Sequence, residues 1–269
     1  MMVIAIVVLV LLALYLFLIA PGLRRPDDSH LRGWLYAHRG LHDGNKAVPE
    51  NSMEAFRLAV EKGYGMELDV QLTKDGQMVV HHDGSLKRVC GVDKNIRDIT
   101  YEELCAIPLP DGTRVPLFSE VLEMVNGRAP IIVEVKHYGG AAKNAAAAWE
   151  VLKTYTGPYC VESFDPTGMA WFRKNAPHVV RGQLADGGRW KKENLNLISH
   201  FALKHLLVNV LSRPHFVAYS VPSDHTLSMW LMKRVFRPGL ACWTVREQKV
   251  LDGAKEYHFP IFELFDPKA

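Results

Sequence analysis

Acidic side chains interrupt two otherwise apolar segments of the chain. In Met-Glu-Leu-Asp-Val-Gln-Leu, Glu67 and Asp69 are two residues apart, so they share one face of an extended strand. In Ile-Ile-Val-Glu-Val-Lys, Glu134 and Lys136 share a face in the same way. Unpaired buried carboxylates are very costly, whereas three converging carboxylates suit a hard divalent cation, Ca²⁺ or Mg²⁺. The same side chains could instead form a buried ion-pair network with Lys136 or Arg39.

Two histidines end strand-like segments and could transfer protons. His38 and Arg39 close the first apolar run, and His82 and Asp83 close a later one. Histidine titrates near neutral pH and suits general acid–base catalysis, while the planar guanidinium of Arg39 suits a phosphate group. We interpret the other histidines as structural, because an isolated histidine more often has a satisfied structural role than a catalytic one.

The motifs that contain these residues follow a specific order. From the N-terminal side they are His38-Arg39-Gly40, Pro49-Glu50-Asn51-Ser52, Glu67-Leu68-Asp69-Val70, Thr73-Lys74-Asp75-Gly76, His82-Asp83, Glu134-Val135-Lys136, Ser163-Phe164-Asp165 and Trp243-Thr244-Val245. Each motif is weak alone, but the ordered set resembles the glycerophosphodiester phosphodiesterase family over residues 34–262.

The resemblance implies a metal-dependent phosphoric diester hydrolase that converts glycerophosphodiesters to sn-glycerol 3-phosphate and an alcohol. It assigns acid–base catalysis to His38 and His82, a divalent cation (Ca²⁺ or Mg²⁺) to Glu67, Asp69 and Glu134, and the phosphate to Arg39 and Lys136. We favour His82 as the acid. The nucleophile is either water or the neighbouring glycerol hydroxyl, which would give a cyclic phosphate.

Three further residues are expected to support this site. Glu50 would support the metal or His38, although a carboxylate capping the first helix is an alternative. Phe164 and Trp243 would form an apolar wall beside the glycerol, with core packing as the alternative. Asn51 is expected to be the N-cap of the first helix.

The chain departs from the family pattern near its C-terminal end. The usual Thr-Asp-x-Pro stretch is replaced by Phe262-Glu263-Leu264-Phe265-Asp266-Pro267. This difference puts in doubt the side of the pocket formed by the last strand, and with it the specificity for the alcohol. The acid–base and metal positions are unaffected.

Strand-like and helical patterns alternate along residues 34–269, which is typical of a parallel sheet. Eight strands are predicted at 34–38, 66–72, 130–136, 160–164, 179–182, 216–220, 240–245 and 259–262. Helices are predicted at 51–62, 117–125, 141–154, 166–175, 191–209, 224–236 and 246–257. With 78–82 as an excursion after the second strand, this count predicts a (β/α)8 TIM barrel, with a short or missing eighth helix. A doubly wound sheet is the alternative, but no G-x-G-x-x-G follows the first strand.

The first twenty residues contain no charged side chain. Twenty helical residues span about 30 Å, which is one bilayer core. No basic residue precedes this run and no clear cleavage site follows it, so we favour a transmembrane anchor over a cleaved signal peptide. We therefore divide the chain into an anchor (1–23), a linker (24–33) and a barrel (34–269). Arg24, Arg25 and Arg32 predict a single-pass protein with its catalytic domain in the cytoplasm.

The charge distribution limits the expected partners. A net charge of +3 is too small to indicate nucleic acid as a partner. The four cysteines include no C-x-x-C pair, so neither a zinc site nor a redox motif is indicated. Residues 189–237 nevertheless have a local charge of +6. Their basic residues are Arg189, Lys191, Lys192, Lys204, Arg213, Lys233, Arg234 and Arg237. This segment is either a set of ordinary solvated helix faces or a surface that rests on anionic lipid.

Two alternatives to the main interpretation differ in substrate or in class. The membrane anchor also fits the same chemistry on a lysophospholipid or a polyglycerophosphate. A catalytically inactive barrel could instead bind a phospholipid headgroup as a scaffold, although all the catalytic and metal-binding residue types are present. A small-molecule or lipid phosphodiester and the membrane are therefore the expected partners.

Overall fold

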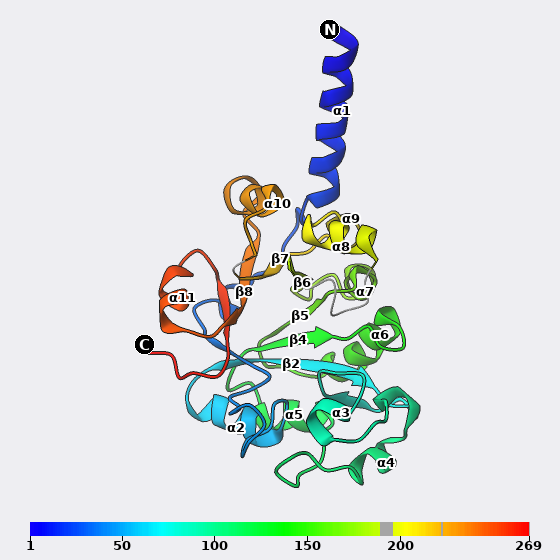
Figure 1. Ribbon diagram of the computed structural model, residues 1–269, viewed down its shortest axis with the longest axis vertical. Helices are drawn as coiled ribbons and strands as arrows, with labels where there is room; N and C mark the ends of the chain where they lie inside the picture. The colour runs from blue at the N-terminus through cyan, green and yellow to red at the C-terminus, as the bar shows by residue number, and fades with distance from the viewer. Residues whose placement is uncertain (189–195, 222, 269) are drawn as a thin grey trace.

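The computed structural model describes residues 1–188, 196–221 and 223–268. Its centre is a closed barrel of eight parallel strands (Figure 1). These are β1 (Tyr36–His38), β2 (Gly65–Leu72), β4 (Ile131–Val135), β5 (Tyr159–Ser163), β6 (Arg181–Ala185), β7 (Phe216–Ser220), β8 (Gly239–Val245) and β9 (Phe259–Phe262). Strand β1 pairs with both β2 and β9, which closes the sheet. The predicted (β/α)8 barrel is confirmed.

Helices cover the outside of the barrel. They are α2 (Met53–Glu61), α5 (Phe118–Val125), α6 (Ala141–Leu152), α7 (Pro166–Asn175), α8 (Leu197–Lys204), α9 (Asn209–Ser212), α10 (Leu227–Leu231), the π-helical turn η4 (Met232–Phe236) and α11 (Gln248–Gly253). No helix follows β9 within the described residues up to 268. An additional N-terminal helix, α1 (Met2–Ile19), projects away from the barrel (Figure 1).

An excursion between β2 and β4 forms a small layer of its own. Strand β3 (Met78–Val80) pairs antiparallel with β2, as expected for an excursion rather than a barrel strand. The short helices α3 (Lys87–Cys90) and α4 (Tyr101–Cys105) follow it. Their apolar side chains form a separate cluster that includes Leu86, Ile96 and Leu104. This layer brings the segment after β3 to the same end of the barrel as the end of β1.

The barrel interior changes character along its axis. At the end where the strands begin, buried apolar side chains fill it, among them Tyr36, Ile132 and Phe216. Two residues further along β4 and β5, the inward positions hold Glu134 and Glu162, which are neighbours in the sheet register. Apolar packing therefore closes one end of the barrel, while carboxylates concentrate at the end where the strands finish, where active sites of this fold lie.

Some predicted boundaries were wrong, for local physical reasons. Helix α2 begins at Met53, and its N-cap is Ser52, whose side chain accepts a hydrogen bond from the backbone N–H of Ala55. The prediction of Asn51 as the N-cap was therefore wrong. Asn51 has a φ of 56° and its side chain donates to Asp69 instead. Strand β6 (Arg181–Ala185) begins and ends later than predicted, because the polar residues Arg181 and Gln183 on its helix-facing side obscured the strand pattern.

The two late helical segments are more broken than predicted. The interval 191–209 contains α8 and the start of α9, and residues 191–195 lie outside the described part of the chain. The interval 224–236 contains α10 followed by η4. Helices α8, α9 and α10 of these segments lie beside the base of α1 in Figure 1.

Candidate active site

A pocket of about 390 Å³ opens where the barrel strands end. Its lining residues come from seven strands and from the segments after strands. They are His38, Arg39, Glu67, His82, Arg88, Glu134, Glu162, Phe164, Leu184, Trp243, Thr244, Arg246, Ile261 and Glu263. Seven of the ten residues predicted for the site line this pocket, and the other three, Glu50, Asp69 and Lys136, contact lining residues from behind.

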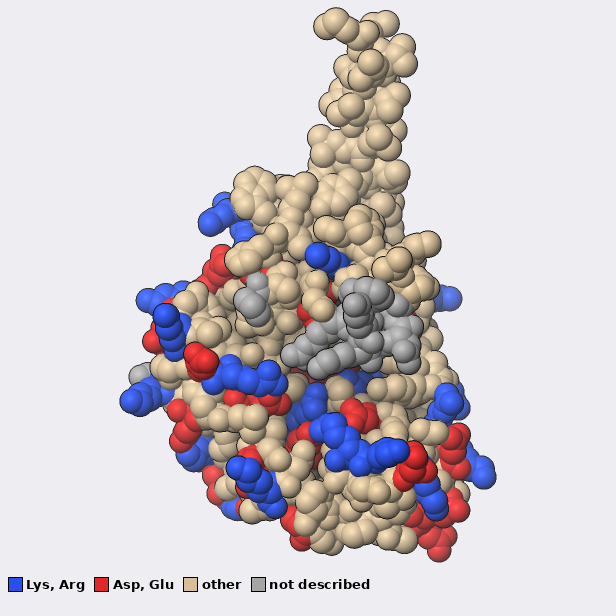
Figure 2. Space-filling view, viewed as in Figure 1, with Lys and Arg blue, Asp and Glu red and all other residues tan. Residues whose placement is uncertain are grey.

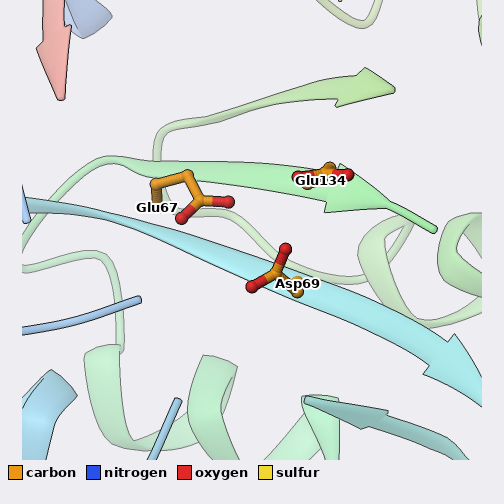
Figure 3. A group of neighbouring side chains, drawn as sticks. All are labelled: Glu67, Asp69 and Glu134. Atoms are coloured by element: carbon orange, nitrogen blue, oxygen red, sulfur yellow. The ribbon is translucent and has the colours of Figure 1, made fainter. Parts of the chain in front are cut away.

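Three carboxylates converge at one wall of the pocket. Glu67 and Asp69 project from β2, and Glu134 projects from β4 toward them (Figure 3). Each offers an oxygen atom within 4.8 Å of an oxygen from the other two, and all three are buried. Burial and the neighbouring Asp69 raise the pKa of Glu67 well above its usual value. Burial also raises the pKa of Glu134, to about 7. The group is thus destabilised as three anions and would gain from a cation.

The ammonium group of Lys136 balances part of this acidic charge. Lys136 Nζ lies 2.9 Å from Asp69 Oδ1 and 2.7 Å from Glu134 Oε1. Burial opposes ionisation of Asp69, but Lys136, His82 and Arg39 together outweigh it and hold the pKa of Asp69 well below its usual range. Lys136 is buried behind the pocket wall. A role in phosphate binding would require its ammonium group to leave one of these carboxylates.

Arg39 is positioned by a tight turn at the end of β1. It has a φ of 57°, and the following Gly40 has a φ of 78° and approaches the backbone of Ala55 too closely for any side chain. The backbone N–H of Arg39 donates to Glu67 Oε2 at 3.1 Å. Its guanidinium lies 2.8 Å from Glu50 Oε1 and lines the pocket. This turn therefore links the phosphate-binding candidate to the acidic group.

The catalytic histidine candidates share one arrangement. His38 Nδ1 lies 2.6 Å from Glu263 Oε1, and His82 Nδ1 lies 2.5 Å from Asp83 Oδ1. Because a carboxylate only accepts hydrogen bonds, each Nδ1 carries a proton and each Nε2 is left for a substrate. His38 Nε2 lies 3.9 Å from Glu67 Oε2, beside the acidic group.

Burial lowers the histidine pKa values in the structure. It lowers the pKa of His38, and the nearby Arg39 lowers it further. It also lowers the pKa of His82, to about 4, with a further contribution from Lys136. Both rings are therefore neutral at pH 7 in the absence of a bound anion. A phosphodiester would oppose this shift because its negative charge favours the imidazolium form.

Glu50 lies in a different environment from the one predicted. Its carboxylate accepts hydrogen bonds from Arg39, Arg88 and Asn45, and contacts neither His38 nor the helix N-terminus. Burial opposes its ionisation, but Arg88 and Arg39 hold the pKa of Glu50 well below its usual range. Arg88 Nε also donates to Asp83 Oδ2 at 2.6 Å. Glu50 thus supports Arg39 directly and His82 only through Arg88 and Asp83.

The aromatic candidates form the opposite wall. Phe164 follows β5 and Trp243 lies on β8, and their rings pack edge to face with centroids 5.5 Å apart. Both are half-buried and line the pocket. They give the pocket one apolar side facing its charged side.

Sequence reasoning missed four charged residues of the pocket lining: Arg88, Glu162, Arg246 and Glu263. Glu162 has a detectable signal, because it is a carboxylate on the inward face of an apolar strand beside Glu134. Glu263 has none, because it lies 225 residues from the histidine that it contacts. The pairing of β1 with β9 brings the two together.

Comparisons with known proteins agree with this geometry. Residues 38–259 match the model of the glycerophosphoryl diester phosphodiesterase family. A glycerophosphodiester phosphodiesterase of Bacillus altitudinis is 35% identical over 159 residues, which cover 54% of this chain and 63% of the relative. The aligned segment thus spans less than two thirds of that relative's length.

Solved structures share the fold. The crystal structure of a glycerophosphodiester phosphodiesterase from Thermotoga maritima is 30% identical, with a TM-score of 0.65, covering 85% of this chain and 93% of that one. An Oleispira antarctica phosphodiesterase in complex with the product sn-glycerol-3-phosphate is 21% identical, with a TM-score of 0.70, covering 87% and 93%. At that identity the second likeness concerns the fold alone. With its family match over most of its length, this chain belongs to the glycerophosphoryl diester phosphodiesterase family.

Proposed function

We propose that this protein hydrolyses glycerophosphodiesters to sn-glycerol 3-phosphate and an alcohol, with the help of a divalent cation. The observation that carries the proposal is the pocket itself. Two histidines with free Nε2 atoms, an arginine and three converging carboxylates line or adjoin one cavity. The relative from Bacillus altitudinis carries the same activity in its name.

The residues of the pocket fit a cation. Four buried carboxylates (Glu67, Asp69, Glu134 and Glu162) gather at this end of the barrel. Among the described residues, no hydrogen-bond donor reaches Glu162 Oε2. Burial and Glu134 raise the pKa of Glu162 well above its usual value. Acidic oxygens in excess of the local cations are the donor set that Ca²⁺ and Mg²⁺ prefer. Glu67, Asp69 and Glu134 would hold the ion, which would supply positive charge to the phosphate oxygens.

The chain's own residues supply the proton transfers. We assign His38 as the base, because its Nε2 lies beside Glu67, where a nucleophile held near the acidic group would lose its proton. His82 is then the acid that protonates the leaving alkoxide, whose unassisted pKa is far too high for departure. Arg39 is placed to pair with the phosphate. Glu263 and Asp83 stabilise the imidazolium form of the two rings and fix their orientation.

The test of this proposal is product release by the full-length chain in detergent or nanodiscs. Glycerophosphocholine, glycerophosphoethanolamine and glycerophosphoglycerol are supplied with Mg²⁺, Ca²⁺ or EDTA, beside His38→Ala and Glu67→Gln. We expect cation-dependent release of glycerol 3-phosphate that both variants lose. A transient cyclic phosphate would identify the glycerol hydroxyl as the nucleophile. No release from any substrate by a folded protein would refute the proposal and favour a headgroup-binding scaffold.

A second candidate substrate is a lysophospholipid, and a specific cavity favours it. An apolar pocket of about 350 Å³ lies between the ends of β4 and β5 and helix α8. Phe164 lines both this pocket and the active-site pocket. An acyl chain could lie in it while the phosphodiester reaches the histidines. Ala202→Trp, which would fill the pocket, should reduce turnover of a lysophospholipid and spare glycerophosphocholine. Equal effects on both substrates would remove this candidate.

We also propose that α1 anchors the protein in a membrane. Its 18 residues have a mean hydropathy of 3.3, and by length and composition it could span a bilayer or be a signal sequence. Its last turn is integrated into the fold, since Ile19 is buried and its carbonyl accepts a hydrogen bond from Asn209 Nδ2 at 2.8 Å. Arg213 donates to the carbonyls of Phe17 and Ala20. Cleavage near Ala20 would discard these contacts, so they support retention.

The orientation of the anchor is part of the same proposal. Arg24 and Arg25 lie in the short segment that follows α1. By the positive-inside rule the barrel lies in the cytoplasm. Protease added outside intact cells should leave the barrel uncut, and the intact mass should include Met2–Ile19. Digestion from outside would reverse the orientation, and loss of that helix would identify a signal peptide.

A further inference from the structure

Exposed apolar side chains gather around the base of α1. After α1, ten large hydrophobic side chains of the described residues are exposed, and eight of them lie on segments beside its base. We call these eight the collar: Leu23, Leu197, Ile198, Phe201, Leu211, Leu227, Trp230 and Val235. They come from the segment just after α1 and from α8, α9, α10 and η4, and α8, α9 and α10 lie beside the lower end of α1 in Figure 1. Scattered exposed apolar residues are ordinary, but a cluster of this kind marks an interaction surface.

The collar is rigidly connected to the end of the helix. Tyr15, Leu16 and Ile19 pack against the cluster that contains Met229 and Met232. Immediately after the helix, the backbone N–H of Gly22 donates to the carbonyl of Pro214. No flexible spacer therefore separates α1 from the barrel, and the collar has a fixed position relative to the helix.

The length of α1 decides where the collar lies in a membrane. Eighteen helical residues rise about 27 Å, slightly less than the roughly 30 Å of a hydrocarbon core. Ile19 is already buried in the domain, which leaves an even shorter segment for lipid. When a span is shorter than the core, its flanking residues are drawn toward the interface. The residues so drawn are those of the collar.

The composition of the collar also suits this location. Trp230 is 56% exposed, and tryptophan is enriched at the level of lipid headgroups. Arg24, Arg234 and Arg237 are exposed on the same segments and would meet anionic headgroups. Figure 2 shows a mostly uncharged surface from α1 down to α8 and α10, with acidic and basic side chains concentrated further from the helix. Arg189, Lys191 and Lys192, also predicted for such a surface, lie outside the described residues.

We propose that the collar is embedded in the headgroup region of the anionic bilayer leaflet from which α1 emerges. The barrel then contacts the membrane through α8, α9, α10 and η4, and not through α1 alone. Helix α8, which lines the apolar pocket beside the active-site pocket, is held at the lipid surface. This inference rests on α1 as a membrane anchor and is independent of the hydrolytic activity.

The test measures which side chains contact lipid in the full-length chain. The protein, with Cys90 and Cys105 changed to serine, is reconstituted in vesicles of phosphatidylcholine and phosphatidylglycerol. A fluorophore is attached to a single cysteine, and brominated lipids serve as the quencher. Ile198→Cys probes the collar and Val8→Cys probes the span. Leu264→Cys is the matched control, because it is exposed and apolar but belongs to the C-terminal segment, which lies away from α1 in Figure 1. Cys160 and Cys242 are buried and remain unlabelled.

We expect strong quenching at positions 8 and 198 and little at 264. Quenching of a label at position 8 with none at position 198 would contradict the lipid contact of the collar but leave the anchor in place. No quenching at position 8 would contradict both the anchor and the lipid contact of the collar. A label at 198 that is shielded from iodide yet unquenched by lipid would point to a protein partner and also overturn the proposal.

A second variant tests whether the apolar side chains themselves are responsible. Phe201→Ser and Trp230→Ser together remove two large exposed groups without emptying the core. Quenching of a label at Leu227→Cys should fall toward the level of the control, while Val250→Ser, at an exposed position off the collar, should leave it unchanged. Unchanged quenching in the double variant would contradict the role assigned to these side chains.

Discussion

The two sides of the active-site pocket hold their histidines by different means. On the β1 side, His38 is paired with Glu263, which β9 delivers from the far end of the chain. On the β3 side, His82 is paired with Asp83, the next residue in sequence. The side chain of Glu263 is 7% exposed, whereas that of Asp83 is 26% exposed. The first pairing thus depends on closure of the barrel and excludes water, while the second is local and partly solvated.

The two histidines are therefore assigned similar proton transfers, but their carboxylate partners are held in place by different contacts. The His38 pairing should be sensitive to any change in the β1–β9 contact, because no neighbouring residue in sequence replaces Glu263. The His82–Asp83 pair belongs to a network of ion pairs. Arg88 donates hydrogen bonds to both Asp83 and Glu50, and Glu50 also accepts one from Arg39. The predictions below use substitutions on each side to separate the two modes of support.

The largest effect should come from the histidines themselves. His38→Gln and His82→Gln should each reduce the hydrolysis rate by about 10²- to 10⁴-fold, because each removes one proton transfer. A substrate with a good leaving group, such as glycerol phosphate p-nitrophenyl ester, should restore much of the rate of His82→Gln and none of that of His38→Gln. Rescue of the opposite variant would exchange the acid and base assignments. Equal rescue of both would refute separate roles.

The carboxylate partners should come next, with unequal effects. Glu263→Gln should reduce kcat by about 100-fold, because it removes a buried charge that stabilises the imidazolium and orients the ring. Asp83→Asn should cost about 10-fold, because water can take its place at a partly exposed site. KM should change less than kcat in both variants. Steady-state kinetics on glycerophosphocholine checks this order, and equal losses would contradict the contrast drawn from burial.

The features that could be predicted from the sequence are those that depend on local contacts, and the missed partner of His38 depends on closure of the barrel. The barrel, the carboxylates of β2 and β4 and both histidines leave alternating or strand-end patterns that can be read locally. Asp83 is adjacent to its histidine and lies within a recognised motif. Glu263 could not be assigned, because its pairing with His38 exists only once β1 and β9 are neighbours. The position of Asn51 was misread because its side chain serves Asp69 rather than its own helix.

Acid stability should depend on the β3 side in particular. Arg88 and Arg39 hold the pKa of Glu50 well below its usual range despite burial, and His82 and Arg88 do the same for Asp83. A depressed carboxyl pKa contributes stability above the unfolded pKa of about 4, and that stability is lost as the pH falls toward the folded value. The melting temperature of the protein in EDTA should therefore decline below about pH 4.

Glu50→Gln separates this contribution from the rest of the fold. It should lower the free energy of unfolding at pH 7 by about 1 to 3 kcal/mol, because Arg39 and Arg88 lose a charged partner. It should also flatten the decline in melting temperature below pH 4. Glu54→Gln is the matched control, since Glu54 lies nearby on α2, its side chain is 41% exposed and it pairs with Arg57 on the surface. An equally steep acid decline in Glu50→Gln would show that other groups cause it.

The smallest effect should come from Arg246, a partner of Glu263 in addition to His38 and His42. Its guanidinium contacts Glu263 Oε2, but the side chain is 50% exposed, so solvent screens the pair. Arg246→Met should change kcat by less than about 3-fold, because Glu263 keeps its contact with His38 through the other oxygen, Oε1. Kinetics at low and high salt checks this, and the small effect should shrink as salt rises. A loss as large as that of Glu263→Gln would mean that Arg246, and not barrel closure, fixes the carboxylate against His38.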